Sequence, residues 1–273
     1  MPSPSTLQLA VAGLGAIGYA VARAVDAGEV DGISLAAVAA RDHAKARAKL
    51  EGFRSNPPLV PLAELGDHAG IVLESIPGAY FADVARPAIE RGCIFMPLSV
   101  GQLLEHMDLV DLARQTGARI MVPTGALAGL DAVRAIAEGN VESIRIITRK
   151  PPRGLAGAPY LVANSISMDE VKQPLKVFEG SAREAIKGFP ANVNVAVALS
   201  LAGVGPDRTR IEIWADPGVT RNTHTIEARS DSSHLSITIE NIPSVENPAT
   251  GKVTALSAIA ALRRLTAPLV VGT

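Results

Sequence analysis

Three glycines in the spacing G-x-G-x-x-G, at residues 13–18, lie between an apolar run at residues 7–12 and a helical pattern at residues 17–27. At such a turn the first glycine permits a tight reversal of the chain, the second lets the backbone approach a pyrophosphate, and the third lets the helix lie close to the strand. The N–H groups and the dipole of the helix N-terminus also favour phosphate. The turn therefore predicts a β-α-β unit that binds a dinucleotide. The residues expected at the cofactor are Gly13, Gly15, Ala16, Ile17 and Gly18.

Short apolar runs alternate with helical patterns over residues 1–123. Such alternation is typical of β-α-β units that share a parallel sheet, and about 120 residues suffice for a complete doubly wound dinucleotide domain. We therefore predict an α/β protein whose N-terminal Rossmann domain, a doubly wound parallel sheet, spans residues 1–123. The six expected strands are Leu7–Ala12, Ile33–Ala39, Leu59–Val60, Gly70–Glu74, Cys93–Pro97 and Arg119–Val122.

A different pattern begins near residue 141, where apolar and polar residues alternate one by one. This period is typical of half-exposed strands, so residues 124–247 are predicted to form a second, α+β substrate domain around a mixed sheet. The final segment, residues 248–273, has a helical apolar period and is expected to pack back on the first domain. The expected strands of the second domain are Val141–Lys150, Arg210–Ala215, Thr223–Ala228 and Leu235–Glu240, with helices within Ala182–Ala202.

The charge balance and the cysteine count exclude several classes of protein. The 273 residues carry 26 Lys and Arg against 27 Asp and Glu, a net charge of -1, so no general attraction to nucleic acid or anionic lipid is expected. No window of the sequence reaches the roughly 20 apolar residues of a membrane span. The single cysteine, Cys93, allows neither an intramolecular disulfide nor a multi-cysteine metal site, and its apolar neighbours predict a buried thiol. We expect a cytoplasmic homodimer without a metal ion.

The tip of the second expected strand lacks the acid that would bind a ribose 2′-hydroxyl. Arg41 follows the strand there instead. A guanidinium group at this position is able to pair with a 2′-phosphate through two hydrogen bonds, although a solvated surface arginine fits the pattern equally well. We therefore expect the cofactor to be NAD or NADP, with Arg41 among the residues that bind it.

Two further segments combine small and polar residues. Residues 123–131 follow the sixth expected strand, and their small side chains suit either a flat nicotinamide ring at the edge of the sheet or an ordinary strand-to-helix turn. Asn192 and Asn194 precede an apolar helix, where one suits a helix cap and the pair suggests a polar contact. Of five histidines, only His224 is expected inside a strand of the second domain, with Asn222 as a polar neighbour.

Eight motifs occur in order along nearly the whole chain: GLGAIG at 13–18, SVGQL at 99–103, PTGALAGLD at 123–131, TRKPP at 148–152, FPANVNVA at 189–196, ADP at 215–217, N-x-H at 222–224 and NPATGKVTALSAIAALR at 247–263. In these motifs the chain resembles the L-aspartate dehydrogenase family. The resemblance implies a Rossmann domain with an inserted α/β domain, and the NAD(P)-dependent oxidative deamination of L-aspartate to iminoaspartate, then to oxaloacetate and ammonia. It also implies that His224 is the catalytic histidine, and that one of Ala126 and Ala128, with one of Asn192 and Asn194, contacts the cofactor.

This implied reaction has chemical requirements that residues of the chain are able to meet. Oxidation of an α-amine needs a base for the ammonium proton, and the imine that results needs an activated water. One histidine such as His224, with an unperturbed pKa of about 6.5, is able to serve both transfers. A dicarboxylate also needs cations, for which Arg149 and Lys150 are candidates unless they form a solvated strand end, and Asn222 is the expected polar contact.

Other two-domain Rossmann oxidoreductases remain as alternatives, among them sugar dehydrogenases and enzymes like dihydrodipicolinate reductase. An acylating semialdehyde dehydrogenase would need a nucleophilic cysteine in the substrate domain, but Cys93 lies in the first domain. A sugar dehydrogenase of this architecture would need a Lys-Pro pair near the fifth strand, where this chain has Met96-Pro97. A non-catalytic dinucleotide sensor is the third alternative, and it would leave His224 without a role.

Overall fold

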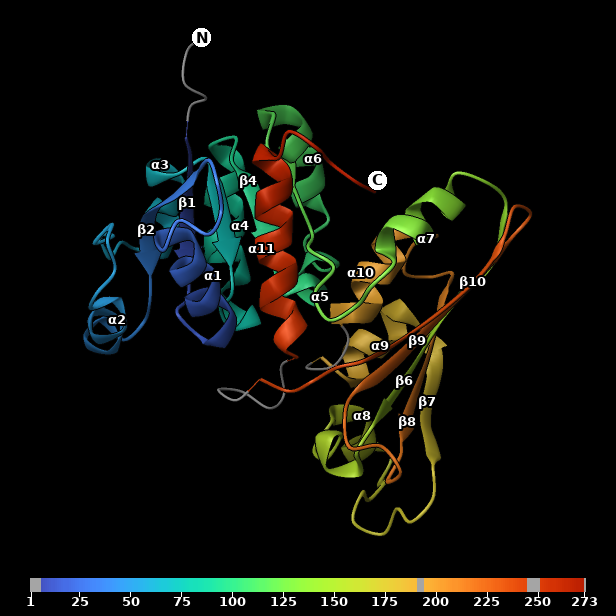
Figure 1. The fold of residues 1–273 in the computed structure, drawn as a ribbon. Helices are drawn as coiled ribbons and strands as arrows, with labels where there is room; N and C mark the ends of the chain where they lie inside the picture. The colour runs from blue at the N-terminus through green and yellow to red at the C-terminus, as the bar shows by residue number, and fades with distance from the viewer. Residues whose placement is uncertain (1–5, 191–193, 245–250, 273) are drawn as a thin grey trace. The chain divides into compact units, whose positions relative to one another are not determined.

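The computed structural model describes residues 6–190, 194–244 and 251–272, and it divides into two compact units (Figure 1). The first unit consists of Met1–Pro123 and Thr254–Val270, and the second of Thr124–Val253 and Val271–Thr273. Of the helices in the described part of the chain, none combines the length and the hydropathy that crossing a membrane requires.

A parallel sheet forms the centre of the first unit, as predicted. In the described residues its strands lie in the order β2-β1-β3-β4-β5, and every neighbouring pair is parallel. Each strand begins and ends within two residues of a predicted one. The strands are β1 (Leu7–Ala12), β2 (Ile33–Ala39), β3 (Ile71–Glu74), β4 (Ile94–Pro97) and β5 (Arg119–Ile120).

The prediction of a strand at Leu59–Val60 is wrong. This segment forms only a single parallel bridge to Val38, through hydrogen bonds of 3.0 Å from Val38 N–H to the Pro58 carbonyl and from Val60 N–H to the Val38 carbonyl. Pro58 and Pro61 stand on either side and have no N–H to donate, so the ladder cannot be extended. Because the bridge lies on the free edge of β2, the chain still follows the 3-2-1-4-5-6 order of dinucleotide-binding sheets.

Helices cover both faces of this sheet. On one face Val21 of α1 and Leu262 of α11 join Met96 of β4 in a buried apolar cluster. On the other face Phe81 of α4 meets Phe95 of β4 edge to face, with ring centroids 5.7 Å apart. Consecutive residues of a strand point to opposite faces, so the sheet is doubly wound. The helices are α1 (Ala16–Asp26), α2 (His43–Leu50), α3 (Leu65–His68), α4 (Phe81–Glu90), α5 (Val100–Leu103), α6 (Asp108–Thr116) and α11 (Lys252–Thr266).

A mixed sheet forms the second unit, also as predicted. Its order in the described residues is β10-β9-β6-β8-β7, with β6 and β8 parallel and the other neighbours antiparallel. The strand β7 was not predicted, because a register shift between Lys176 and Phe178 interrupts its alternation and leaves Val177 and Phe178 both buried. The strands are β6 (Val141–Lys150), β7 (Leu175–Ser181), β8 (Thr209–Ala215), β9 (Thr223–Ser230) and β10 (His234–Glu240).

The two faces of this second sheet differ in chemistry. Even-numbered residues of β6 from Ile144 to Lys150 are buried on the face that α7, α9 and α10 cover (Figure 1). On the other face Arg145 is paired with Glu227, with a hydrogen bond of 2.7 Å from Nε. That outer face is therefore polar where it is described, and the homodimer stays a prediction. The helices are α7 (Leu130–Ala137), α8 (Pro159–Ala163), α9 (Ala182–Gly188) and α10 (Asn194–Ala202).

Substitution of Gly18 tests how closely α1 approaches β1. A Cβ atom at Gly18 would lie 2.0 Å from the Gly13 carbonyl oxygen, whereas one at Gly15 would meet nothing within 4 Å. We expect Gly18→Ala to lower the free energy of unfolding by about 1–3 kcal/mol through overpacking, and Gly15→Ala to change it by less than about 0.5 kcal/mol. Urea denaturation of the two variants measures this difference. Equal stabilities would contradict the close approach.

Candidate active site

The glycine turn forms a cradle at the end of β1. Gly13 has a φ of +92°, a conformation that favours glycine, and its carbonyl accepts a hydrogen bond from Ser75 Oγ at 3.0 Å. Gly15 is exposed at the start of α1, where the absence of a side chain leaves room for a phosphate. Ala16 and Ile17 follow in the first helical turn and are half-buried. The geometry fits the pyrophosphate of a dinucleotide at exposed N–H groups.

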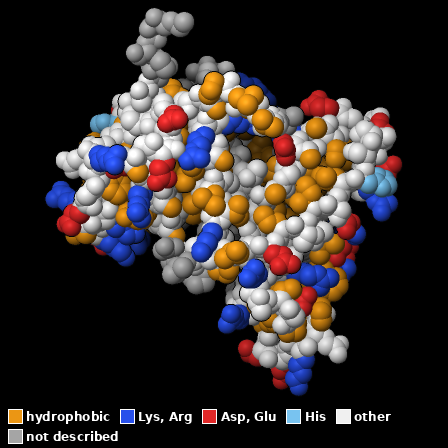
Figure 2. Space-filling view, in the orientation of Figure 1, with side chains coloured by type: hydrophobic (Ala, Val, Ile, Leu, Met, Phe, Trp, Pro, Cys, Tyr) orange, Lys and Arg blue, Asp and Glu red, His pale blue; other side chains and the backbone are white. Residues whose placement is uncertain are grey.

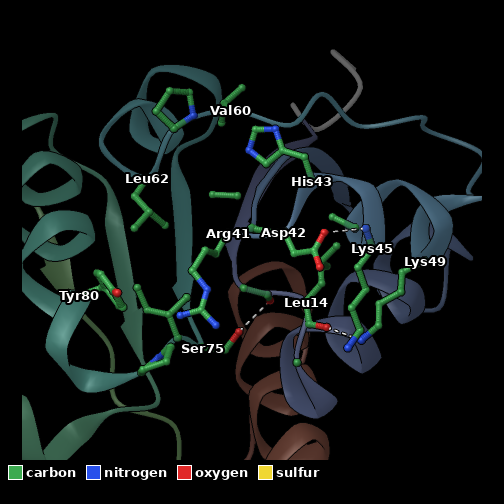
Figure 3. Close-up of a pocket in the computed structure, with 18 residues that line it drawn as sticks. Leu14, Arg41, Asp42, His43, Lys45, Lys49, Val60, Leu62, Ser75 and Tyr80 are labelled. Atoms are coloured by element: carbon green, nitrogen blue, oxygen red, sulfur yellow. Dashed lines mark hydrogen bonds between the residues drawn. The ribbon is translucent and has the colours of Figure 1, made fainter.

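A cavity of about 480 Å³ opens beside this turn within the first unit (Figure 3). Its wall is formed by residues 13–15 of the turn, 39–43 after β2, 60–62 after the bridge and 75–77 after β3, together with side chains of α2. Arg41 belongs to this wall, and its guanidinium group points into the cavity toward Ser75. The carboxyl ends of parallel strands thus border the cavity, as in other dinucleotide-binding sheets.

A buried carboxylate that sequence reasoning missed holds two of the neighbouring loops. Glu74, at the end of β3, is fully buried. Its Oε1 accepts from Ile76 N–H at 2.9 Å, and its Oε2 accepts from Ser99 N–H at 2.9 Å. Burial raises the pKa of Glu74, while these hydrogen bonds act in the opposite direction. Glu74 therefore joins the loop after β3 to the loop after β4; the only signal in the sequence is an acid that ends an apolar strand.

In the second unit, His224 lies on β9 opposite Thr148 of β6, and only 3% of it is exposed. Its Nδ1 is 3.0 Å from Thr148 Oγ1. Burial, together with the positive charge of Lys150, lowers the pKa of His224 to about 3. The expectation that this histidine titrates near 6.5 is therefore wrong, and the ring is neutral at physiological pH. Burial also lowers the pKa of Lys150, to about 8.

The strand pairing brings several candidate side chains to one face. Thr148 and Lys150 are two residues apart on β6, and residues two apart in a strand point the same way. Thr148 is paired with His224, so these three side chains belong to one face of the sheet, while Asn222 directly precedes β9. Arg149 lies between Thr148 and Lys150 and points to the other face. There its Nη1 is 3.0 Å from Asp216 Oδ2, and the guanidinium group lies 4.7 Å from the Trp214 ring centroid.

A cavity of about 640 Å³ lies within the second unit, and Lys150 and Asn222 belong to its lining. Arg149 is not part of that lining, whereas Arg153 and Arg221 are. Both of these arginines are exposed, Arg153 in a short 3-10 helix and Arg221 in the bend before β9, where neither periodicity nor strand position marked them. Their only sequence signal is proximity to motifs, since Arg153 directly follows TRKPP and Arg221 directly precedes N-x-H. The cavity is therefore rich in cations, as a site for an acidic ligand requires.

Of the expected cofactor contacts in the second unit, Ala126 and Ala128 fall on a loop. The carbonyl of Ala126 accepts a hydrogen bond of 3.1 Å from Asn241 Nδ2, and the Asn241 N–H donates to the carbonyl of Asn222 at 2.9 Å. Asn241, which the sequence did not single out, thus connects the Ala126 loop to the segment that carries His224. Ala128 is exposed in the same loop as Ala126. Asn194 is the exposed first residue of α10, and Asn192 lies outside the described residues.

Comparisons with known proteins match both units. The family model described as "Aspartate dehydrogenase, C-terminal" matches residues 131–265, and the model described as "Homoserine dehydrogenase, NAD binding domain" matches residues 13–123. The chain is 57% identical over 269 residues to an L-aspartate dehydrogenase of Bradyrhizobium diazoefficiens, covering 98% of this chain and 95% of the relative. It is 51% identical over 273 residues to L-aspartate dehydrogenase 3 of Bordetella bronchiseptica, covering 100% of both chains.

Solved structures share the fold. The crystal structure of aspartate dehydrogenase from Thermotoga maritima matches with a TM-score of 0.74 at 24% identity, over 97% of this chain and 99% of that one. Scyllo-inositol dehydrogenase from Lactobacillus casei matches with a TM-score of 0.55 at 13% identity, over 96% of this chain and 86% of that one. At these identities the likeness concerns the arrangement of the elements.

Acidification should destabilise the fold through His224. Its pKa of about 3 in the folded protein lies below that of an unfolded histidine, about 6.5, so between these values the unfolded chain binds the proton more tightly and stability falls as the pH falls. From pH 7.5 to pH 5 this residue alone should remove about 2 kcal/mol. Urea denaturation at both pH values measures the free energy of unfolding. Between pH 7.5 and pH 5 this free energy should fall by about 2 kcal/mol less in His224→Gln than in the wild type.

The exposed histidine His234 provides the control for this measurement. His234→Gln should keep the pH dependence of the wild type. If His224→Gln also kept the pH dependence of the wild type, the assignment of His224 as a buried, neutral histidine would be contradicted.

Proposed function

The chain belongs to the L-aspartate dehydrogenase family, and we propose that it catalyses the reversible NAD(P)-dependent oxidative deamination of L-aspartate to iminoaspartate, which water converts to oxaloacetate and ammonia. Family membership decides against the sugar dehydrogenase and the non-catalytic sensor. The observation that carries the proposal is that His224 and Lys150 share one face of the second sheet, and that Lys150 lines a cavity rich in cations together with Asn222. A dinucleotide-binding turn alone would suit many reactions, but this face suits an amino acid that carries more than one carboxylate.

The residues of the first unit would hold the cofactor. Gly13 and Gly15 leave the backbone open to the pyrophosphate, and Arg41 lines the cavity beside them. When bound, NAD or NADP supplies the acceptor for the hydride that leaves Cα of aspartate. Ala126 or Ala128, and Asn192 or Asn194, are proposed as the contacts from the second unit. The support for these positions is the matching motifs in which they lie.

We assign the proton transfers to His224. Since Nδ1 faces Thr148 Oγ1, Nε2 is the nitrogen left for the substrate, and it is able to accept a proton when Nδ1 carries the hydrogen and donates to Thr148. A histidine with a pKa of about 3 is a weak base. Bound aspartate brings two carboxylates, and negative charge close to the ring raises the pKa of the histidine toward neutrality. The base therefore becomes effective when its substrate is present.

The same residue serves the second half of the reaction. After the ammonium group has lost a proton to His224 and Cα has lost its hydride, His224 releases that proton to solvent. It then accepts a proton from the water molecule that attacks the imine carbon and returns this proton to the departing ammonia. Burial of His224 and its contact with Thr148 restrict the motion of the ring, so the same nitrogen is presented in both steps.

Cations of the second cavity are proposed to hold the two carboxylates. Lys150 is buried at its wall, while Arg153 and Arg221 are exposed there and present planar groups that suit two-point contact with a carboxylate. Asn222, two residues before His224, adds an amide to the lining of the same cavity. Arg149 is proposed to have a structural role instead, because it is paired with Asp216 on the opposite face.

Removal of the base should reduce turnover. We expect His224→Ala to lower kcat by about 10²- to 10⁴-fold, the usual effect of losing a general base, and to leave cofactor affinity nearly unchanged because the glycine turn is intact. Steady-state rates of nicotinamide absorbance change with L-aspartate measure the first effect, and cofactor fluorescence titration the second. His234→Ala is the matched control. A variant at His224 that kept more than about a tenth of wild-type kcat would exclude the residue as the base.

Removal of a proposed clamp should weaken substrate binding. We expect Arg221→Ala to raise KM for L-aspartate by about 10- to 100-fold, which corresponds to one charge-assisted contact, with little change in KM for the cofactor. Arg149→Ala removes the same charge on the other face, and KM for L-aspartate should change less than about threefold. Initial-rate kinetics over both substrates check this pair. The reverse result would return Arg149 to the site and remove Arg221 from it.

A further inference from the structure

Lys150 differs in its surroundings from the other cations of the second cavity. It ends β6 and is only 7% exposed, whereas Arg153 and Arg221 are exposed. Of the described residues that line this cavity, none carries a carboxylate, and most of the others are Pro, Ala, Gly, Leu or Phe. Lys and Arg side chains are visible on the surface of this unit around α8 (Figure 2). The amine of Lys150 is therefore part of an apolar wall to which the cavity contributes further positive charge.

These surroundings make Lys150 a nucleophile. Burial lowers the pKa of its amine to about 8, so about a tenth of these side chains are neutral at pH 7. A neutral lysine amine adds to a carbonyl carbon and forms an imine, and desolvated lysines serve as nucleophiles in this way. Arg153 and Arg221 keep their charge at any physiological pH and are not able to do so. The protonated form of Lys150 still suits the carboxylate contact assigned above.

A group that transfers protons lies close to this amine. Thr148 is paired with His224, and Lys150 follows two residues later on β6, so Lys150 and His224 are diagonal neighbours on one face, with backbones about 7–8 Å apart. The two are close enough for the charge of Lys150 to lower the pKa of His224, in addition to the larger effect of burial. A molecule of the size of aspartate is able to contact both side chains at once.

From this arrangement we propose that Lys150 forms an imine with oxaloacetate, and that the protein thereby decarboxylates oxaloacetate to pyruvate without a cofactor. The inference rests on the proposed function, since it places the product of that reaction in the second cavity. The keto carbon of oxaloacetate, C2, is the carbon that carries the amine in aspartate. Arg153 and Arg221 suit the carboxylate next to C2, which pyruvate retains.

The step needs only oxaloacetate, water and one proton. Neutral Nζ of Lys150 adds to C2, and the former carbonyl oxygen leaves as water after taking one proton from the amine and one from solvent through His224. The positive imine nitrogen then accepts the electron pair of the C3–C4 bond, and C4 leaves as carbon dioxide. The enamine that remains takes up a proton at C3, and water adds to C2 and releases pyruvate and the lysine. No external oxidant or reductant takes part.

Trapping of the imine tests the proposal on the wild-type chain, so it does not depend on the folding of a variant. The protein is incubated with oxaloacetate, EDTA and sodium cyanoborohydride, which reduces an imine to a stable secondary amine. We expect peptide mass spectrometry to find this adduct at least about tenfold more often on Lys150 than on Lys187, an exposed lysine of α9 outside the cavity. Equal labelling of the two lysines would overturn the inference.

Pyruvate formation in the same mixture, without the reductant and without a dinucleotide, is followed by the methyl signal in proton NMR. EDTA suppresses decarboxylation by stray metal ions. Lys150→Arg keeps the positive charge but is not able to form the imine, and we expect it to lower the protein-dependent rate at least about tenfold. Lys187→Arg makes the same change on α9 and should keep the wild-type rate.

Two results of the rate measurement would overturn the inference: pyruvate formation by the wild type no faster than in buffer alone, or an undiminished rate in Lys150→Arg. If the same preparation oxidises L-aspartate with NAD or NADP, either result leaves the proposed function standing. A wild-type preparation that neither released pyruvate nor oxidised L-aspartate would overturn the proposed function and this inference together.

Discussion

The chemistry of the second unit depends on the register in which β9 pairs with β6. Thr148 stands opposite His224, and the two-residue period of β6 then places Lys150 on the same face. A shift of β9 by one residue against β6 would turn His224 to the opposite face, away from Thr148 and Lys150. That opposite face carries ion pairs such as Arg145 with Glu227, which would be costly to bury. The chemical difference between the two faces therefore stabilises the observed register of β9 and β6. That register brings the residues of the candidate site together.

Burial gives the residues of this face their chemical character. His224 and Lys150 are both removed from water. Burial lowers the pKa of each side chain, and a lower pKa favours the neutral form. A basic site of this kind is completed by an acidic ligand, since the carboxylates compensate the buried positive charge and restore basicity to the histidine.

Prediction from the sequence was most successful where the signal is local. Apolar runs marked β1 to β4 and the alternating strands β6, β8, β9 and β10, because burial imposes a period on neighbouring residues. It failed at Leu59–Val60, where prolines stop a ladder that the apolar run suggested, and at β7, where a register shift breaks the alternation. Among the residues that line the second cavity, Arg153 and Arg221 were missed because exposed arginines outside long helices and strands follow no period. The low pKa of His224 was also missed, because it depends on burial by distant segments.

The sequence by itself determined the class of fold, the dinucleotide turn and the family, since each is encoded in short motifs whose residues act together locally. The tertiary structure decided which candidates share a cavity. Arg149 and Lys150 are adjacent in the sequence and equally basic, yet one faces Asp216 and Trp214 and the other faces the cation-lined cavity. Glu74 and Asn241 acquire their roles only through hydrogen bonds to segments far away in the chain. Side-chain direction and burial are properties of the packed sheet, so no single segment of the sequence contains them.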